Sequence, residues 1–183
     1  MIVYESLFGN THEVAEAIGE GVRASDPSGE VSCLAVADAG PDLVAGADLL
    51  VVGGPTHMRG MSTSRSRTVG VRNAVEEGHE KPSEIEPGAE GEGIRDWFHT
   101  LPKATRTAEA AAFDTRAGSR LAGGAAHGIA RRLRRHGYEL AADPEGFVIE
   151  GTEGPLRTGE HDRARRWGAD LFERASASVA ARR

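Results

Sequence analysis

Cysteine, lysine, aromatic residues and long apolar runs are all scarce in this chain of 183 residues. The single cysteine, Cys33, has no partner for an internal disulfide, and its apolar neighbours favour a buried strand position. No apolar run approaches the roughly 20 residues of a membrane-spanning helix, so we expect no membrane insertion. The first residues lack a basic segment followed by an apolar one, and we therefore expect a cytoplasmic protein.

Positive charge is also in deficit. Lysine and arginine number 22 against 28 acidic residues, a net charge of −6, which argues against a nucleic-acid partner because phosphate binding relies on clustered basic residues. The one basic cluster, at residues 131–135, is expected on the solvent side of a helix. The seven histidines are scattered without metal-ligand spacing, so we expect no metal site, and no pattern identifies a catalytic nucleophile of the protein itself.

Strand and helix patterns alternate along the chain. Apolar runs predict strands at about residues 2–4, 31–36, 48–52 and 110–113, with a fifth strand in two pieces at 138–140 and 147–149. Helical spacing of apolar residues follows Thr11 and recurs over 94–101, 126–133 and 164–175. This alternation predicts an α/β fold in three layers, a doubly wound, five-stranded parallel sheet with right-handed crossovers.

The length suits one domain, which we expect to span residues 1–176. Residues 61–93 interrupt the pattern as a long loop or insertion, acidic from residue 76 on, and loops of that length are uncommon in compact domains. The tail at 177–183 is expected to fray.

The loop after the first predicted strand, residues 6–11, carries the strongest functional signal. Hydroxyl and amide side chains surround Gly9 where a helix is expected to begin. The first N–H groups of a helix have no partner within it and the helix dipole attracts an anion, so this loop could hold a phosphate. The same residue types also serve as ordinary helix caps, and the loop alone leaves both interpretations open.

Other phosphate-binding motifs are excluded on residues. No lysine precedes Thr11 as a nucleotide-binding P-loop requires, and no G-x-G-x-x-G follows the first strand. A phosphate-accepting receiver would need an aspartate where this chain has Gly53 and Gly54, and a cysteine phosphatase would need an arginine six residues after Cys33.

Residues 4–11 and 51–57 resemble the flavodoxin family, whose phosphate loop reads roughly Ser/Thr-x-Ser/Thr-Gly-x-Ser/Thr. Segments 113–137 and 137–167 are similar to the family's later flavin loop, strands and helices, so the resemblance covers most of the chain outside 61–93. It implies a flavodoxin-like sheet with strand order 2-1-3-4-5 and FMN as the cofactor.

The resemblance also implies which residues would bind FMN, and the redox chemistry would then belong to the flavin rather than to a catalytic side chain. The phosphate loop would be Ser6, Leu7, Phe8, Gly9, Asn10 and Thr11. The two sides of the isoalloxazine would be lined by Pro55, Thr56, His57 and Met58 and by Asp114, Thr115, Arg116, Gly118 and Ser119.

Two departures from the family pattern bear on binding. Phe8 stands where the family has a hydroxyl, and the positions that usually stack an aromatic ring on the flavin carry His57 and Ser119. Both changes predict weaker FMN binding and a more open flavin face. His57 is either a proton relay or substrate contact beside the flavin or a polar loop residue. Arg116 either meets an anionic substrate or is an ordinary surface residue.

The expected function is FMN-dependent electron transfer with a redox partner protein or a small quinone-like acceptor. An NAD(P)H:quinone-type reductase, and a partner-binding module that has lost tight FMN binding, stay open as alternatives. Residues 76–93 would either cover the flavin edge or join subunits, and the sequence leaves the oligomeric state undetermined.

Overall fold

Four parallel strands make the centre of the sheet. They are β1 (Ile2–Tyr4), β2 (Cys33–Ala35), β3 (Leu49–His57) and β5 (Glu109–Ala117), in the order β2-β1-β3-β5. The edge beyond β5 is shared by β6 (Glu139–Leu140) and β7 (Glu145–Ile149), which both pair with β5 in parallel. The predicted order 2-1-3-4-5, with a fifth strand in two pieces, is thereby confirmed.

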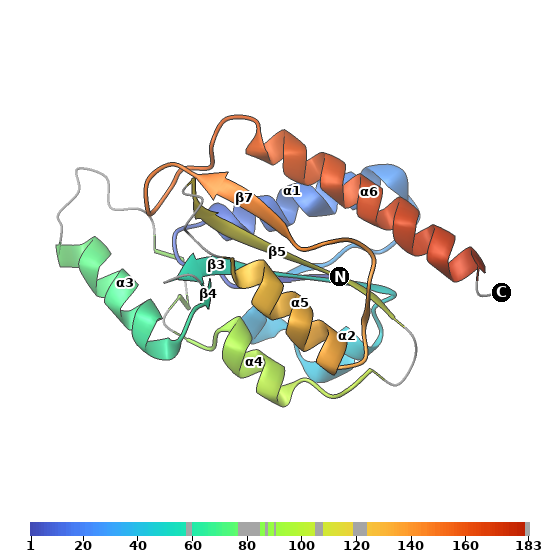
Figure 1. The fold of residues 1–183 in the computed structure, drawn as a ribbon, viewed down its shortest axis with the longest axis horizontal. Coiled ribbons are helices and arrows are strands. Elements are labelled where there is room, and N and C mark those ends of the chain that lie inside the picture. Colours follow the sequence, from blue (N-terminus) through green and yellow to red (C-terminus); the bar gives the residue numbers. More distant parts are fainter. Residues whose placement is uncertain are drawn as a thin grey trace.

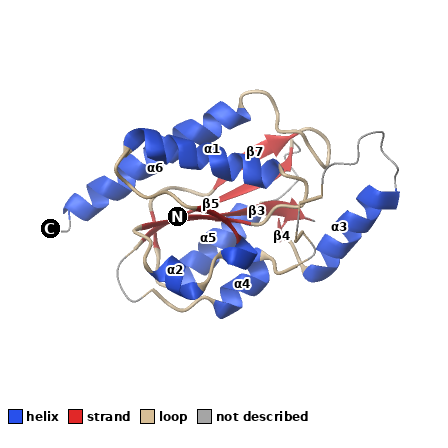
Figure 2. Cartoon of the chain, turned by 180° about the vertical axis from the view of Figure 1, so that it is seen from behind, coloured by secondary structure: helices blue, strands red, loops and turns tan. Residues whose placement is uncertain are grey.

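This computed structural model describes residues 1–57, 60–76, 85–86, 88–89, 91–104, 108–118 and 124–181, with side chains of 73–76 left out. Helices cover both faces of the sheet (Figures 1 and 2). One face carries α1 (Asn10–Ser25) and α6 (Glu160–Ala181), and the other carries α2 (Pro41–Ala45), α4 (Ile94–Thr100) and α5 (Ala125–Arg135). A short 3₁₀ turn, η1 (Val36–Asp38), follows β2. The predicted three layers are confirmed, and within the described ranges no helix is long and apolar enough to cross a membrane.

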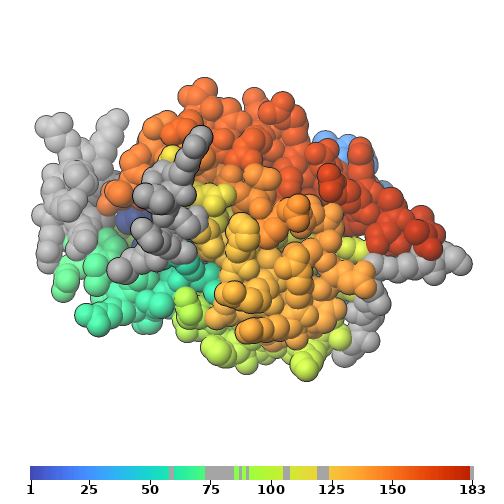
Figure 3. All heavy atoms as spheres, viewed as in Figure 1, coloured from blue at the N-terminus to red at the C-terminus, as the bar shows by residue number. Residues whose placement is uncertain are grey.

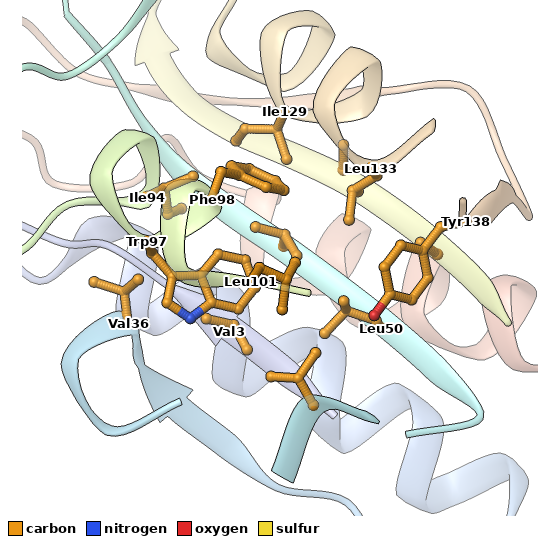
Figure 4. Packing of buried hydrophobic residues seen from close by; sticks show 14 of the residues in the cluster. Val3, Val36, Leu50, Ile94, Trp97, Phe98, Leu101, Ile129, Leu133 and Tyr138 are labelled. Atoms are coloured by element: carbon orange, nitrogen blue, oxygen red, sulfur yellow. The ribbon is translucent and has the colours of Figure 1, made fainter. Parts of the chain in front are cut away.

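Alternating side chains of the strands feed two separate cores. Val3 and Leu50 point to the cluster under α4 and α5, where Trp97 and Leu133 are buried (Figure 4). Ile2, Val51 and Phe113 belong to the cluster under α1 and α6. Because both faces of the sheet are covered, the stretches 2–4, 49–52 and 110–113 are apolar at every position, which is why their sequence runs are continuous rather than alternating.

The helices α1 and α6 touch backbone to backbone. A Cβ atom at Gly21 would overlap the carbonyl oxygen of Arg165, and one at Gly168 would overlap that of Ile18. Glycine at both positions allows an approach that a side chain of any size would prevent. This contact fixes the spacing between the first and last helices.

The structure corrects two expectations. The predicted long loop at 61–93 begins with ordered elements, the strand β4 (Gly60–Met61), antiparallel to β3, and the helix α3 (Ser64–Glu76); residues 77–84 lie outside the described part. The tail expected to fray is helical through Ala181. Ala175 is buried and the Ser178 hydroxyl donates to a Glu109 carboxylate oxygen at 2.6 Å, so the last turns of α6 are tied to the sheet.

Candidate functional site

The loop between β1 and α1 lies at the carboxyl end of the sheet. Gly9 adopts a left-handed conformation with φ of 81°, and its carbonyl accepts the Glu13 N–H at 2.9 Å. Gly9 is also the N-cap of α1, and no side chain caps this helix. The ordinary cap role that the sequence left open for Ser6 and Thr11 is therefore not observed. Within the described chain, the backbone N–H groups of residues 6–11 have no hydrogen-bond acceptor.

Each polar side chain of this loop has a different environment. The Ser6 hydroxyl is buried and has no partner among the described residues. The Thr11 hydroxyl lies 2.7 Å from that of Thr115 at the end of β5. The Asn10 amide donates to the Glu153 carbonyl at 2.5 Å. Two of the three groups thus hold the loop to the neighbouring segments, while the Ser6 oxygen lacks a donor or acceptor.

The end of β3 forms a second wall. The Thr56 hydroxyl accepts the Ala125 N–H at 2.9 Å, which places the start of α5 beside this strand. His57 is half-buried, and its pKa is lowered chiefly by burial and also by Arg67, against an opposing effect of Glu5. His57 is therefore neutral at pH 7, with one nitrogen that donates a hydrogen bond and one that accepts.

The end of β5 holds a buried carboxylate. One oxygen of Asp114 accepts the Ala126 N–H at 2.9 Å, and the other lies 3.3 Å from Arg116 Nε as an ion pair without hydrogen-bond geometry. Burial raises the pKa of Asp114, although the Ala126 bond and Arg116 both act to lower it. Arg116 is consequently held against the sheet rather than extended into solvent.

These walls enclose a cavity of about 880 Å³, within the range of about 300–1,000 Å³ typical of small-molecule sites. We call it the sheet-edge cavity. Ten of the fifteen predicted residues line it: Ser6, Leu7, Phe8, Asn10, Thr11, Pro55, Thr56, His57, Thr115 and Arg116. Gly9 and Asp114 lie directly behind this lining, and Gly118 is exposed beside Arg157. Met58 and Ser119 lie outside the described residues.

Two further parts of the wall were not predicted. The start of α3 supplies one side, and the turn after β7 supplies another. Figure 1 shows α3 standing across the carboxyl ends of the strands. The additional lining residues are Thr63, Arg65, Ser66, Val69, Gly70, Ala117, Ile149, Thr152 and Glu153. A weak helical pattern around Val69 was the only sequence signal for them, because the residues of α3 that face the protein are largely polar.

Buried charges attach α3 to the sheet. Glu5, at the end of β1, accepts the Ser62 hydroxyl with one oxygen and the Ile94 N–H with the other, the latter at 2.9 Å. Arg67 of α3 is 2 % exposed and donates to Ser62 at 3.2 Å and to Asp96 at 3.0 Å. The Arg67 interaction holds the pKa of Asp96 below its usual value. This Glu5–Ser62–Arg67 network, which sequence reasoning missed, fixes one wall of the sheet-edge cavity.

Metal ligands do not gather in this region. Among the described residues, no group of three or more histidine, cysteine or acidic side chains could hold a metal ion. Cys33 is partly buried, and burial raises the pKa of its thiol to about 12, so the thiol is protonated at neutral pH.

Comparison with known proteins agrees with this architecture. Residues 2–85 match the model of the family described as flavodoxin, and no curated protein matches the chain. A flavodoxin from the domain Archaea is 22% identical over 96% of both chains, with a TM-score of 0.62. Oxidised flavodoxin 1 from Bacillus cereus is 13% identical over 94% of this chain and 95% of that one, with a TM-score of 0.63.

A WrbA-like flavodoxin protein from Agrobacterium tumefaciens is 18% identical over 96% of both chains, with a TM-score of 0.58. At these identities the structural likeness concerns the fold. Together with the family match, which covers the phosphate-type loop and β3, it leads to one conclusion. The chain has the flavodoxin fold along nearly its whole length, and its residues 2–85 match the flavodoxin family model.

Proposed function

We propose that this protein binds FMN in the sheet-edge cavity and transfers electrons between a donor and an acceptor. The phosphate would lie at residues 6–11, and the isoalloxazine would lie between the ends of β3 and β5. Bound FMN would supply the electron-transfer chemistry, while the protein binds it, orients it and limits its access to water.

The buried Ser6 hydroxyl is the observation that carries this proposal. Buried polar atoms in native proteins are almost always hydrogen-bonded, so an orphan of this kind calls for a partner, and the described residues supply none. It lies next to backbone N–H groups that also have no acceptor, at the start of a helix whose dipole favours an anion. A phosphate ester would satisfy both with its oxygens.

The rest of the cavity suits a flat ring system with polar edges. Leu7, Phe8 and Pro55 supply apolar surface, and Val69 of α3 adds to it. The neutral His57 can donate a hydrogen bond at the ring edge with its N–H, or accept one with its other ring nitrogen, and in this form it adds no charge to the cavity. Arg116 would place positive charge near the ring.

Departures from the family pattern set the expected strength of binding. Phe8 offers no hydroxyl to the phosphate, and no aromatic ring among the described residues stacks where the family usually has one. Each lost aromatic pair removes about 0.5–1.5 kcal/mol beyond its area. The flavin would accordingly be held mainly through its phosphate.

Titration of flavin-free protein with FMN, followed by quenching of flavin fluorescence, tests this assignment. Riboflavin, which lacks the phosphate, is the matched control. We expect FMN to bind at least about tenfold more tightly, since hydrogen bonds to a charged group contribute about 1.5–3 kcal/mol. Protein that is colourless and does not bind added FMN would support the partner-binding module instead. Equal affinities for FMN and riboflavin would contradict the proposed phosphate site.

The alternative of a reductase has its own assay. The exposed face left by the missing stacking groups would admit a small acceptor, and a reductase loaded with FMN would oxidise NAD(P)H when a quinone is supplied. A carrier would show little turnover with these two substrates and would exchange electrons with a redox protein instead. We favour the carrier because no residue pattern for a nicotinamide or quinone is found.

A further inference from the structure

A group of arginines lies on the face of the molecule that carries α4 and α5. We call Arg95, Arg131, Arg132 and Arg135 the arginine surface. Arg131 and Arg135 are exposed and Arg132 is half-buried on α5, and Arg95 comes from the first turn of α4. Figure 3 shows α5 at the front of this face with α4 directly below it.

No carboxylate neutralises this group within the described part of the chain. Arg23, Arg157 and Arg163 each have an acidic side chain within 4.0 Å, whereas none of the four residues of the arginine surface does. Arg95 donates only to backbone carbonyls, those of Met61 and Ser62, at 3.0 and 3.1 Å. The four positive charges therefore face one another and the solvent.

These arginines repel one another, and the effect falls on Arg132. Burial lowers the pKa of this guanidinium first, and Arg95, Arg131 and Arg135 lower it further. The dipole of α5 favours cations in its last turn and offsets part of this for Arg132 and Arg135. It offers nothing to Arg95, at the start of another helix, so the dipole alone does not account for the cluster.

Three of the four arginines lie on α5, whose first residue borders the sheet-edge cavity, although none of the four lines that cavity. The first N–H of α5 donates to Thr56 in the cavity wall, and Met61 lies against Gly128 on the way to Arg132. By the 1.5 Å rise of a helix, Arg132 lies about 10 Å along α5 from Ala125.

We propose that the arginine surface docks a partner protein through an acidic patch. Charge complementarity selects this occupant, since four uncompensated positive charges match a cluster of carboxylates and would steer its approach. The proposal goes beyond FMN binding and does not depend on it.

Two other anionic partners fit less well. A nucleic acid fits less well because the arginine surface includes no exposed aromatic ring on which bases could stack. An anionic membrane would require apolar anchors, and the exposed large apolar residues of the described chain, Leu43, Val69 and Val179, lie on other elements. A protein with surface carboxylates needs neither feature.

Fluorescence anisotropy with a labelled poly-glutamate peptide tests the proposal at low ionic strength. The test variant carries Arg131→Glu and Arg135→Glu. The control carries Arg166→Glu and Arg174→Glu, two exposed positions of α6 across the sheet, and changes the net charge by the same amount. We expect the wild type and the control to bind the peptide, the test variant to bind at least about tenfold more weakly, and salt to abolish binding.

Absence of peptide binding by the wild type, or equal loss in both variants, would overturn the proposal. So would tighter binding of an oligothymidylate of equal charge, or cosedimentation with phosphatidylserine vesicles. Because the substituted side chains are exposed, we expect circular dichroism to show that both variants are folded. The titrations need no flavin, and their failure is therefore distinct from a failure to bind FMN.

Discussion

The hydroxyls of Thr11 and Thr115 lie 2.7 Å apart, although 104 positions separate these residues in the chain. Both are nearly fully buried, and their hydrogen bond joins the loop before α1 to the end of β5. The two sides of the sheet-edge cavity are therefore held at a fixed distance by one bond between side chains.

Replacement Thr115→Val tests this bond. The Thr11 hydroxyl would stay buried without a partner, so we expect the free energy of unfolding to fall by about 1–3 kcal/mol in urea denaturation. Thr115→Ser keeps a hydroxyl at the same place and should retain most of the stability. Equal losses in both variants would mean that the methyl group, not the bond, matters.

Ser6→Ala separates binding from stability. The Ser6 hydroxyl has no partner in the described chain, so its removal should leave the stability of the flavin-free protein unchanged or raise it. FMN affinity should fall about 10- to 100-fold by fluorescence titration, since a bond to a charged phosphate is lost.

Ser62→Ala is the matched control for that experiment. Ser62 links Glu5 and Arg67 and does not line the cavity, so this variant should lose stability with little direct change in FMN affinity. The Ser6 interpretation fails if the two variants respond alike in both measurements.

Arg67→Met would remove the buried guanidinium that Ser62 links to Glu5, while Glu5 keeps the bonds from Ser62 and Ile94. Breaking a buried ionic arrangement from one side costs about 3–5 kcal/mol, and we expect a loss of that size in chemical denaturation. Arg65→Met, at an exposed position of the same helix, should change stability by no more than about 0.5 kcal/mol. Adding Glu5→Gln to Arg67→Met should recover part of the loss; no recovery would show that Glu5 is not the stranded charge.

Gly154→Ala should loosen the anchor of the phosphate-type loop. Gly154 has φ of 113°, and a Cβ there would overlap the Asn10 side chain, which donates to the Glu153 carbonyl. Gly151 has φ of 61° with open space around it, so Gly151→Ala suffers only the backbone strain of about 1–2 kcal/mol. We expect Gly154→Ala to lose more stability than this control by thermal unfolding, and only Gly154→Ala to weaken FMN binding.

Asp114→Asn should change how stability depends on pH. Burial raises the Asp114 pKa, so the folded protein holds this proton more tightly than the unfolded chain does. The associated stability is complete below the ordinary pKa of about 3.9 and is lost as pH rises through the raised value. Between pH 4 and 7 the wild type should therefore lose stability relative to Asp114→Asn. A constant difference across this range in urea titrations would contradict the assignment.

The sheet was predictable because strands that are buried on both faces have continuous apolar sequences. The runs at residues 2–4 and 49–52 are apolar at successive positions, and residues 147–149 of the fifth strand show the same bias. The loop between β1 and α1 was predictable because its glycine and hydroxyl residues stand together along the chain, while its phosphate role stays a prediction.

The remaining walls of the cavity were not predictable for a physical reason. The helix α3 is attached through Arg67, a charged residue that usually faces solvent, and so it shows little apolar periodicity. Glu153 meets Asn10 across 143 positions, a contact set by the path of the chain and not by any local pattern. Glu5 likewise gains its role only from partners distant in sequence.

The close approach of α1 and α6 at Gly21 and Gly168 has a consequence for how this sequence can diverge. Either position can acquire a methyl group only if the two helices separate, and separation would open the apolar layer beneath them along its length. The two sites therefore constrain each other across 147 residues, and relatives with a larger residue at one of them should have α1 and α6 set farther apart.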